Sequence, residues 1–432
     1  MMNDLTQITY KSDILDEKYQ KITLDCGLQI LVFPKKMSTV YALFGVRYGS
    51  VNNSFTDISG EEITVPDGIA HFLEHKLFFN EDGSDSFERF SEYGADANAY
   101  TSFNKTAYLF SCTDNLDKSL GELLYFVTHP YFTESSVAAE VGIISEEIRM
   151  YDDNPSDRCF YGMLEGMYEH HSLRRNICGS ESSISKITAD TLYKCYSAFY
   201  RPDNMVLIVC GDVDAEHVAM ISRQHLPKSF IGSSVKKTND NDKEKRQAFK
   251  GYTEQKMQVA KPLFCIGFKD TDIPTCPKER QKKDAVASIL DEMLFSSAGE
   301  LYDSLFERSI ISPSLSYGYT ISESFAYHSI SGEADSPSQV LDEVLAYIDR
   351  IKAQGLNEDD FQRAKRVMYS ETVRLFDSTE SISNALFSFA CEDAEIFEYA
   401  EIIRGITFDD VLATLNESFD RDTVTLSVVK PL

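Results

Sequence analysis

A repeated ending constrains the fold of this chain most strongly. The stretch ITADTLYKCYSAFYRPDNMVLIVCGDV, which begins at Ile187, matches ITFDDVLATLNESFDRDTVTLSVVKPL, which begins at Ile406. In each copy a threonine shortly before an acidic residue is typical of a helix N-cap, and an amphipathic helix, a turn and an apolar strand follow. Helix-turn-strand endings are common, so chance is the alternative explanation. We favour two structurally related halves.

The region from 228 to 256 separates the two halves. It is polar, charged and poor in apolar residues, as linkers are. We therefore predict two domains, at 1–227 and 257–432, joined by a linker at 228–256. In the first half, strands at 21–35 and 39–50 precede the helices, without strict alternation. This order predicts an α+β fold, each half a mostly antiparallel sheet covered by helices.

The charge of the chain limits its partners. Its 69 acidic and 42 basic residues give a formal net charge of −27, which repels nucleic acid and anionic lipid. The charge either only keeps the protein soluble or forms an acidic chamber that attracts basic peptides. Nine scattered cysteines without a CxxC pair, a polar start and the lack of a long apolar run predict a cytoplasmic protein with no membrane segment.

The stretch GIAHFLEHKLF, residues 68–78, has the residue types of a metal site. On a helix over 69–79, His71 and His75 are four residues apart, so both rings project from one face, with Glu74 beside them. This HxxEH pattern inverts the order of the common HExxH zinc motif. The alternative is an ordinary amphipathic helix whose apolar side is Ile69, Phe72, Leu73 and Leu77.

A catalytic zinc needs a third protein ligand and an open position. The stretch AAEVGIISEEIRMYDDNP offers Glu140, Glu146 and Glu147. Glu140 and Glu147 are seven residues apart and share a helix face, whereas Glu146 points elsewhere. The apolar anchors of this helix are predicted to be Ile143, Ile144 and Ile148. Any one of the three glutamates could be a solvated carboxylate, so these residues alone leave the third ligand open.

These motifs carry a resemblance to a known family. HFLEHKLF, with a glutamate 72 positions after His75, resembles the pitrilysin/insulinase family of inverzincin metallopeptidases. The likeness is strongest to the bacterial branch similar to mitochondrial processing peptidase. It extends over almost the whole chain, through GADANAYTSFNKTAY, EVGIISEEIRMYDDNP and the paired FYRPDNM-like endings.

The resemblance implies that 1–227 is an N-terminal zinc-binding peptidase domain and 257–432 a homologous inactive C-terminal domain. It also implies a role for each residue of the motif. His71, His75 and Glu147 become the ligands of Zn²⁺, and Glu74 becomes the general base that takes a proton from the zinc-bound water. Glu140 becomes a second carboxylate that helps to orient the site. A His₂Glu zinc lowers the pKa of its water and polarises the scissile carbonyl, so a neighbouring base suits this chemistry.

The resemblance also implies where a peptide substrate binds. DANAYTSFNKTAYLF alternates as a strand does, and Asn98 and Ala99 match the family stretch whose edge pairs with substrate backbone. The alternative is an ordinary half-buried strand. His170 and His171 are adjacent, so their side chains diverge on a helix, and we interpret them as loop or surface residues.

The second half departs from the family pattern. The resemblance implies an arginine and a tyrosine there that contact substrate and its developing oxyanion. The chain has Phe306 at the arginine position and Ser312 or Pro313 near the tyrosine position. Arg308, Tyr317 and Tyr319 lie nearby at the wrong spacing. We therefore expect a homologous partner subunit to supply the missing groups, or else a homodimer.

Together these observations predict a zinc-dependent endopeptidase that cleaves peptides or unfolded segments as the catalytic subunit of a two-subunit peptidase. One alternative is a non-proteolytic binding or scaffold subunit with an idle zinc site. Another is a maturation protease dedicated to one substrate.

Overall fold

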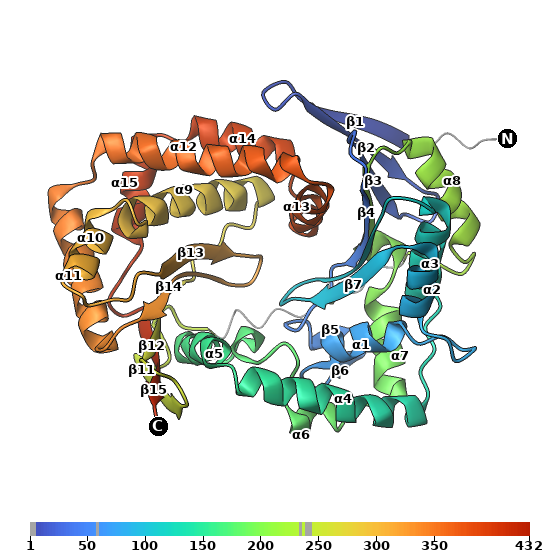
Figure 1. The fold of residues 1–432 in the computed structure, drawn as a ribbon, viewed down its shortest axis with the longest axis horizontal. Coiled ribbons are helices and arrows are strands. Elements are labelled where there is room, and N and C mark those ends of the chain that lie inside the picture. The colour runs from blue at the N-terminus through green and yellow to red at the C-terminus, as the bar shows by residue number, and fades with distance from the viewer. Residues whose placement is uncertain (1–5, 58–59, 233–235, 238–243) are drawn as a thin grey trace. The chain divides into compact units, whose positions relative to one another are not determined.

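The structure, a computed structural model, describes residues 6–57, 60–232, 236–237 and 244–432. Its described residues form two compact units (Figure 1). The first unit contains residues within 6–148, 176–237 and 373–397. The second contains residues within 149–175, 244–372 and 398–432.

The first unit is built on a seven-stranded sheet in the order β1-β2-β3-β9-β4-β8-β7. The strands are β1 (Thr6–Ser12), β2 (Glu17–Thr23), β3 (Gln29–Pro34), β4 (Val40–Val46), β7 (Asp96–Thr101), β8 (Thr106–Cys112) and β9 (Met205–Gly211). All neighbouring strands run antiparallel except β3 and β9. A separate small sheet contains β5 (Ser54–Thr56), β6 (Glu62–Thr64) and β10 (Lys236–Lys237).

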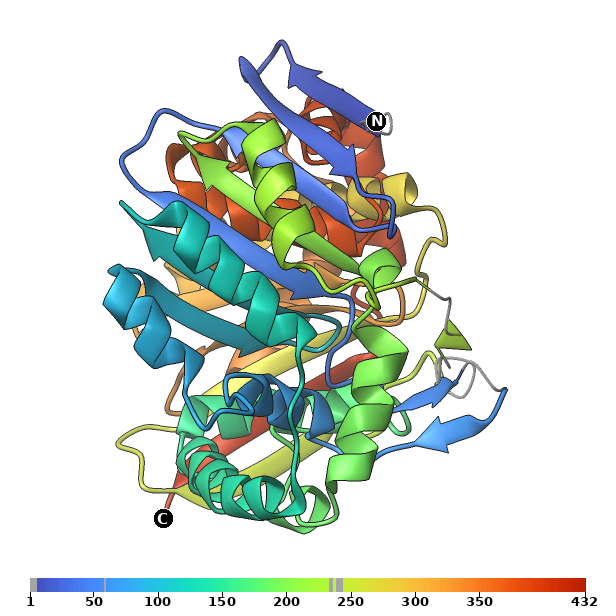
Figure 2. The ribbon, with the colours of Figure 1, turned by 90° about the vertical axis from the view of Figure 1, so that its right-hand side faces the viewer.

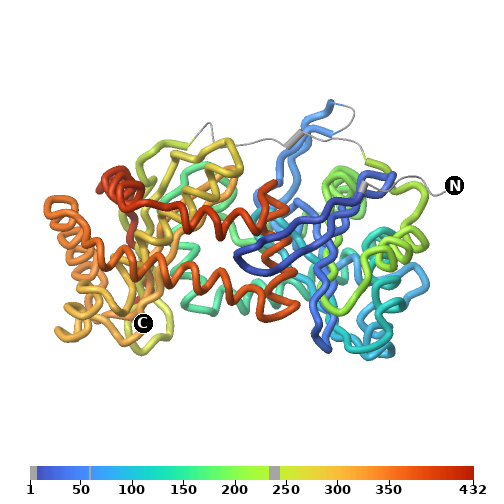
Figure 3. Tube along the Cα trace, turned by 90° about the horizontal axis from the view of Figure 1, so that it is seen from above, coloured from blue at the N-terminus to red at the C-terminus, as the bar shows by residue number. Residues whose placement is uncertain are grey.

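Helices cover both faces of the seven-stranded sheet. Its central strands β4 and β9 are buried along their whole length, so their sequences are continuously apolar rather than alternating. On one face, α3 (Leu116–Thr128) and α8 (Ala215–His225) lie across the strands (Figure 2). On the other, α13 (Thr379–Cys391) packs against β4 and β9 (Figures 1 and 3). Gly45 makes this approach possible, because a Cβ there would lie 2.1 Å from the ring of Phe387.

The remaining helices of the first unit include α1 (Ile69–Leu77), which carries the HxxEH motif. The others are α2 (Ser86–Tyr93), α6 (Glu181–Ile184) and α7 (Ala189–Phe199), together with most of α4 (Glu134–Asp152), which continues into the second unit.

The second unit has a five-stranded sheet in the order β11-β15-β12-β14-β13. Its strands are β11 (Tyr252–Met257), β12 (Leu263–Asp270), β13 (Leu315–Ile321), β14 (Ala326–Glu333) and β15 (Val424–Pro431). Its helices are α5 (Pro155–Met167), α9 (Pro277–Phe295), α10 (Glu300–Glu307), α11 (Pro337–Gln354), α12 (Glu358–Arg374), α14 (Ile396–Gly405) and α15 (Phe408–Glu417). Again one neighbouring pair, β11 and β15, is parallel. The other pairs are antiparallel.

The two units repeat one topology, so the predicted α+β fold of two homologous halves is confirmed. The order β3-β9-β4-β8-β7 of the first sheet corresponds to β11-β15-β12-β14-β13 of the second, with the parallel pair in the same place. The repeated endings are α7 followed by β9 and α15 followed by β15. Both helices begin with a capping box, at Thr188 and Thr407.

The compact units do not coincide with the predicted domain boundaries. Residues 149–175 belong to the second unit, where α5 packs against β12 and β15, and residues 373–397 belong to the first. Helix α5, from the first half of the sequence, therefore packs against the sheet of the second half, and α13, from the second half, packs against the sheet of the first. Within the predicted linker, residues 233–235 and 238–243 lie outside the described residues, and Tyr252–Met257 forms strand β11 instead. Among the described residues, no helix has the length and apolar character that crossing a bilayer requires.

Candidate metal centre

Helix α1 is held in place at its first turn. It begins after Gly68, whose φ of 90° is left-handed, and a Cβ at this position would lie 2.4 Å from the carbonyl oxygen of Cys178. A Cβ at Gly179 would lie 2.4 Å from the carbonyl oxygen of Asp67. Two glycines thus allow the start of α1 and the loop at 176–179 to touch through their backbones. The predicted apolar side of the helix, Ile69, Phe72, Leu73 and Leu77, is buried.

The structure brings His71, His75 and Glu147 together. His71 Nε2 lies 3.5 Å from Glu147 Oε1, and His75 Nε2 lies 3.4 Å from Glu147 Oε2. The three ligand atoms are all within 4.8 Å of one another. Helix α4 thus carries its ligand to the motif from more than seventy residues further along the chain.

These three residues fit a zinc ion. Imidazole nitrogens and a carboxylate oxygen lie about 2 Å from zinc, so two ligands of one tetrahedral ion are about 3.4 Å apart. The distances from the two rings to the two oxygens of Glu147, 3.5 and 3.4 Å, are close to this spacing. Buried nitrogen Nδ1 of His71 has no hydrogen-bond partner among the described residues. The imidazole therefore makes its polar contacts through Nε2, the atom that faces Glu147.

Glu140 holds His75 in the orientation that a metal ligand needs. Its Oε1 lies 3.2 Å from His75 Nδ1, which leaves Nε2 directed at Glu147. A carboxylate on the second ring nitrogen commonly fixes the tautomer of a metal-binding histidine. Burial lowers the pKa of His75, but hydrogen bonds with Glu140 and Glu147 outweigh this effect and raise the pKa to about 10. The hydrogen bond with His71 is the largest influence that lowers the pKa of Glu147.

Apolar contacts of α4 differ from the prediction. Ile144 and Ile148 are buried, whereas 59% of Ile143 is exposed, because it lies on the other side of the helix. Glu146 is also exposed, as the predicted helix face requires.

Glu74 lies beside the metal group but is not part of it. The residue is 8% exposed, and Thr101 at the end of β7 donates a hydrogen bond of 2.6 Å to Glu74 Oε2. Burial raises the pKa of Glu74, and the nearby His71 opposes this effect. Sequence reasoning missed Thr101. The signal was available in the alternating strand, which ends at this residue.

Strand β7 is the edge of its sheet, and Asn98 and Ala99 lie on it. The N–H of Ala99 donates to Oδ1 of Asn98 at 2.8 Å, so it faces away from β8. Because side chains alternate along a strand, Ala99 shares the face of Thr101 and Glu74, whereas Asn98 points to the opposite face. There it lines a pocket of about 600 Å³ near the start of α13.

His170 and His171 differ from each other. His170 is exposed, as predicted, but His171 is buried, and its Nδ1 accepts the N–H of Leu173 at 3.0 Å. His171 therefore lies in a loop, as predicted, but not at the surface, because its ring caps a short helix (Ser172–Arg174).

Residues near the expected arginine and tyrosine positions have partners within the second unit. Phe306 is 45% exposed on α10 and stacks on Tyr302. Arg308 pairs with Glu343 at 2.6 Å. The hydroxyls of Tyr317 and Tyr319 donate to Glu292 at 2.5 Å and to Asp270 at 2.8 Å.

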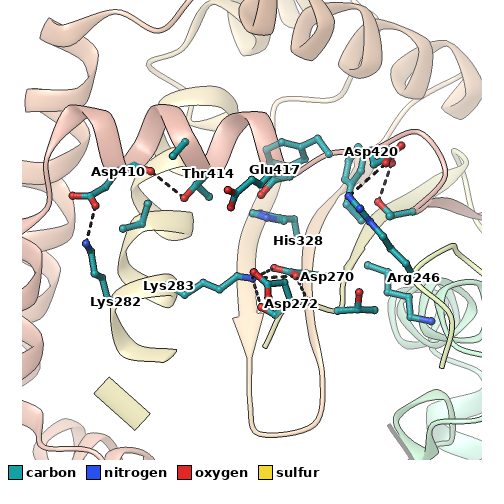
Figure 4. Close-up of a pocket in the computed structure, with 18 of the residues that line it drawn as sticks. Arg246, Asp270, Asp272, Lys282, Lys283, His328, Asp410, Thr414, Glu417 and Asp420 are labelled. Atoms are coloured by element: carbon teal, nitrogen blue, oxygen red, sulfur yellow. Dashed lines mark hydrogen bonds and ion pairs between the residues drawn. The ribbon is translucent and has the colours of Figure 1, made fainter. Parts of the chain in front are cut away.

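The second unit also has a pocket, of about 690 Å³, and Figure 4 shows its charged lining. Cations there pair with neighbouring carboxylates: Lys282 with Asp410 at 2.7 Å, Lys283 with Asp270 at 2.9 Å and Arg246 with Asp420 at 3.6 Å. The pocket contains none of the predicted metal ligands, so it is a separate feature.

Family models match both halves of the chain. The family model described as Insulinase (Peptidase family M16) matches residues 59–181, and that described as Peptidase M16 inactive domain matches residues 186–368. The chain is 37% identical over 407 residues to a Bacillus subtilis protein named uncharacterized zinc protease YmfH, covering 94% of this chain and 95% of that one. It is 22% identical over 428 residues to zinc protease PqqE of Helicobacter pylori, covering 96% and 93%.

Solved structures share the fold. A crystal structure described as an M16-like peptidase of Alicyclobacillus acidocaldarius aligns over the full length of both chains, with a TM-score of 0.91 and 28% identity. A Helicobacter pylori protease aligns with a TM-score of 0.80 and 19% identity, covering 96% of this chain and all of that chain. From its sequence relatives, its fold and its motif, the chain belongs to the insulinase family of peptidases, M16.

Proposed function

We propose that this chain is a zinc-dependent endopeptidase that cleaves peptides or unfolded segments. The observation that carries the proposal is the convergence of His71, His75 and Glu147 on one point, with the buried carboxylate of Glu74 beside them. The zinc protease names of the relatives support the same metal.

A bound zinc ion would lower the pKa of a coordinated water and polarise the scissile carbonyl. In this chain Glu74 is the candidate proton acceptor. Thr101 fixes one carboxylate oxygen of Glu74, and burial raises the pKa of the group toward the range of a general base. Glu140 serves as the positioning carboxylate of His75.

The substrate would bind as an added strand along β7. Since the N–H of Ala99 faces the open edge, alternation places the main-chain groups of Ala97 and Thr101 on that edge too. An extended peptide paired there would have every second side chain on the face of Glu74. Main-chain pairing recognises extended segments of many sequences, which favours peptides and unfolded segments.

A homologous partner subunit would supply the arginine and tyrosine that contact the oxyanion, with a homodimer as the alternative assembly. Support comes from the second unit, where Arg308, Tyr317 and Tyr319 already pair with carboxylates. We also propose a cytoplasmic location, since all nine cysteines are free thiols.

Zinc content and cleavage of a peptide library test the proposal, with the purified chain alone and with any co-purified partner. We expect one zinc per chain and stronger cleavage with the partner. Glu147→Gln should lose zinc. Glu371→Gln is the matched control, since Glu371 has the same place in α12 that Glu147 has in α4, and it should keep zinc because its unit contains none of the three ligands. Zinc without any cleavage under either condition would favour a scaffold subunit, and one sharply preferred sequence would favour a dedicated maturation protease.

A further inference from the structure

Lys76, the residue that follows the second histidine of the motif, is a buried lysine. Its side chain is 4% exposed, its Nζ lies 3.3 Å from Glu140 Oε2, and its ammonium lies 5.0 Å from the ring centre of Phe79. Burying an ammonium group is costly unless a counter-charge accompanies it. Glu140 supplies that charge.

Glu140 divides its two oxygens between neighbouring residues of α1. Oε1 faces Nδ1 of His75, and Oε2 faces Nζ of Lys76. Consecutive side chains on a helix diverge by about 100°, so a carboxylate that contacts both has little rotational freedom. The contact with Lys76 therefore restricts the orientation of the Glu140 carboxylate relative to His75.

The same contact helps to place helix α4. This helix of 19 residues buries Val137, Ile144 and Ile148, so apolar packing holds few of its turns. Glu140 and Glu147 lie two turns apart on it, and both contact α1. A fixed Glu140 consequently restricts the rotation of α4 about its axis, on which the position of Glu147 depends.

We propose that Lys76 is a positioning residue of the metal centre, which holds Glu140 so that this carboxylate orients His75 toward the metal. The proposal rests on the zinc site proposed above. The direction in which zinc affinity changes separates this proposal from a simple charge effect. Removing a positive charge near a cation site would tighten zinc binding through Coulomb forces, whereas removing a positioning group would weaken it.

Lys76→Met tests whether zinc binding becomes weaker or tighter, because methionine removes the charge but keeps most of the length and apolar volume of the side chain. We expect zinc to bind about tenfold more weakly, measured by competition with a chelator. The visible spectrum of the cobalt-substituted protein should also change, since it reports ligand geometry. Lys76→Arg keeps the charge and should recover part of both properties.

A double-mutant cycle shows whether Lys76 acts through Glu140. If it does, Lys76→Met should weaken zinc binding much less in a Glu140→Gln background than in the wild type. Lys269→Met is the matched control, because Lys269 is equally buried in the second unit and pairs with Glu244 at 2.6 Å. We expect the control to lower the melting temperature while leaving the zinc affinity unchanged.

Unchanged or tighter zinc binding in Lys76→Met would overturn the proposal, as would an effect of equal size with and without Glu140. A wild-type chain that fails to bind zinc would instead overturn the proposed function, and the first measurement reveals this before any variant is made.

Discussion

The chain contains two copies of one helix, and they differ in their polar residues. GIAHFLEHKLF at 68–78 forms α1, and AVASILDEMLF at 285–295 forms the end of α9. Both lie between equivalent strands in the chain order. Apolar residues recur at the same six places and are buried in both copies: Ile69, Ala70, Phe72, Leu73, Leu77 and Phe78 correspond to Val286, Ala287, Ile289, Leu290, Leu294 and Phe295.

The second copy has other residues at the polar positions, and its two carboxylates pair with side chains of the same unit. Ser288 stands where His71 does, Asp291 where Glu74 does and Glu292 where His75 does. Asp291 lies 2.8 Å from the buried His328, and Glu292 pairs with Arg363 at 3.0 Å. Met293 replaces Lys76. The carboxylates of the second copy therefore have partners within their own unit.

The edge strands differ in the same sense. Followed through the equivalent strand pairs, Ala99 and Thr101 of β7 correspond to Tyr317 and Tyr319 of β13. The tyrosine hydroxyls reach Glu292 and Asp270, whereas Ala99 has no polar side chain and the shorter Thr101 donates to Glu74. The shared apolar positions specify the scaffold, and a few polar positions distinguish the copy with the candidate metal ligands from the other copy.

Glu74→Gln should give the largest effect. We expect kcat to fall about 10³-fold, because the amide cannot accept the proton, while zinc stays bound. Peptide hydrolysis and zinc content measure the two parts. Asp291→Asn, the matching change in the second copy, should leave kcat unchanged. Normal cleavage by Glu74→Gln would contradict the role of Glu74 as the proton acceptor.

The pH dependence of zinc binding should be the next largest effect. In the metal-free protein the hydrogen bonds with Glu140 and Glu147 outweigh burial and raise the pKa of His75 to about 10. Zinc must displace the proton that this imidazole carries below that pH. The apparent association constant should therefore rise about tenfold per pH unit from pH 7 to 9. Calorimetry in two buffers of different ionisation enthalpy counts the released protons, and a flat profile would contradict the assignment.

The candidate metal ligands could largely be predicted, because local spacing determines them. His71 and His75 share a helix face wherever the helix packs, and the i, i+7 pair narrowed the third ligand to Glu140 or Glu147. Separating those two required the family resemblance. The geometry agrees with it, since Glu147 faces both rings and Glu140 faces the far nitrogen of His75.

Contacts between elements far apart in the chain could not be predicted from the sequence. An amphipathic pattern tells that α5 and α13 bury one side, but it does not tell which sheet receives that side. Thr101 meets Glu74 only through the approach of β7 to α1. The burial of Lys76 could not be predicted, because lysine is rarely buried. The second copy of the helix is hard to recognise in the sequence, because it has no histidines at the positions of His71 and His75.

Asp291→Asn should destabilise the second unit without touching the metal. The carboxylate is buried and forms a short contact with His328, so its replacement leaves the imidazole poorly paired. We expect a loss of about 2 kcal/mol in the free energy of unfolding. A denaturant titration measures it, and zinc affinity serves as the control. Full stability in this variant would mean that the pair contributes nothing.

Ala99→Tyr transfers one edge residue from the second copy to the first. Ala99 lies on the face of Thr101 and Glu74, so a ring there would occupy the space proposed for alternate substrate side chains. We expect kcat/KM to fall about tenfold for long peptides, with zinc still bound, since the residue holds no ligand. The reciprocal change, Tyr317→Ala, removes the hydroxyl that contacts Glu292 and should lower only the melting temperature. Equal cleavage by Ala99→Tyr and the wild type would place the substrate elsewhere than along β7.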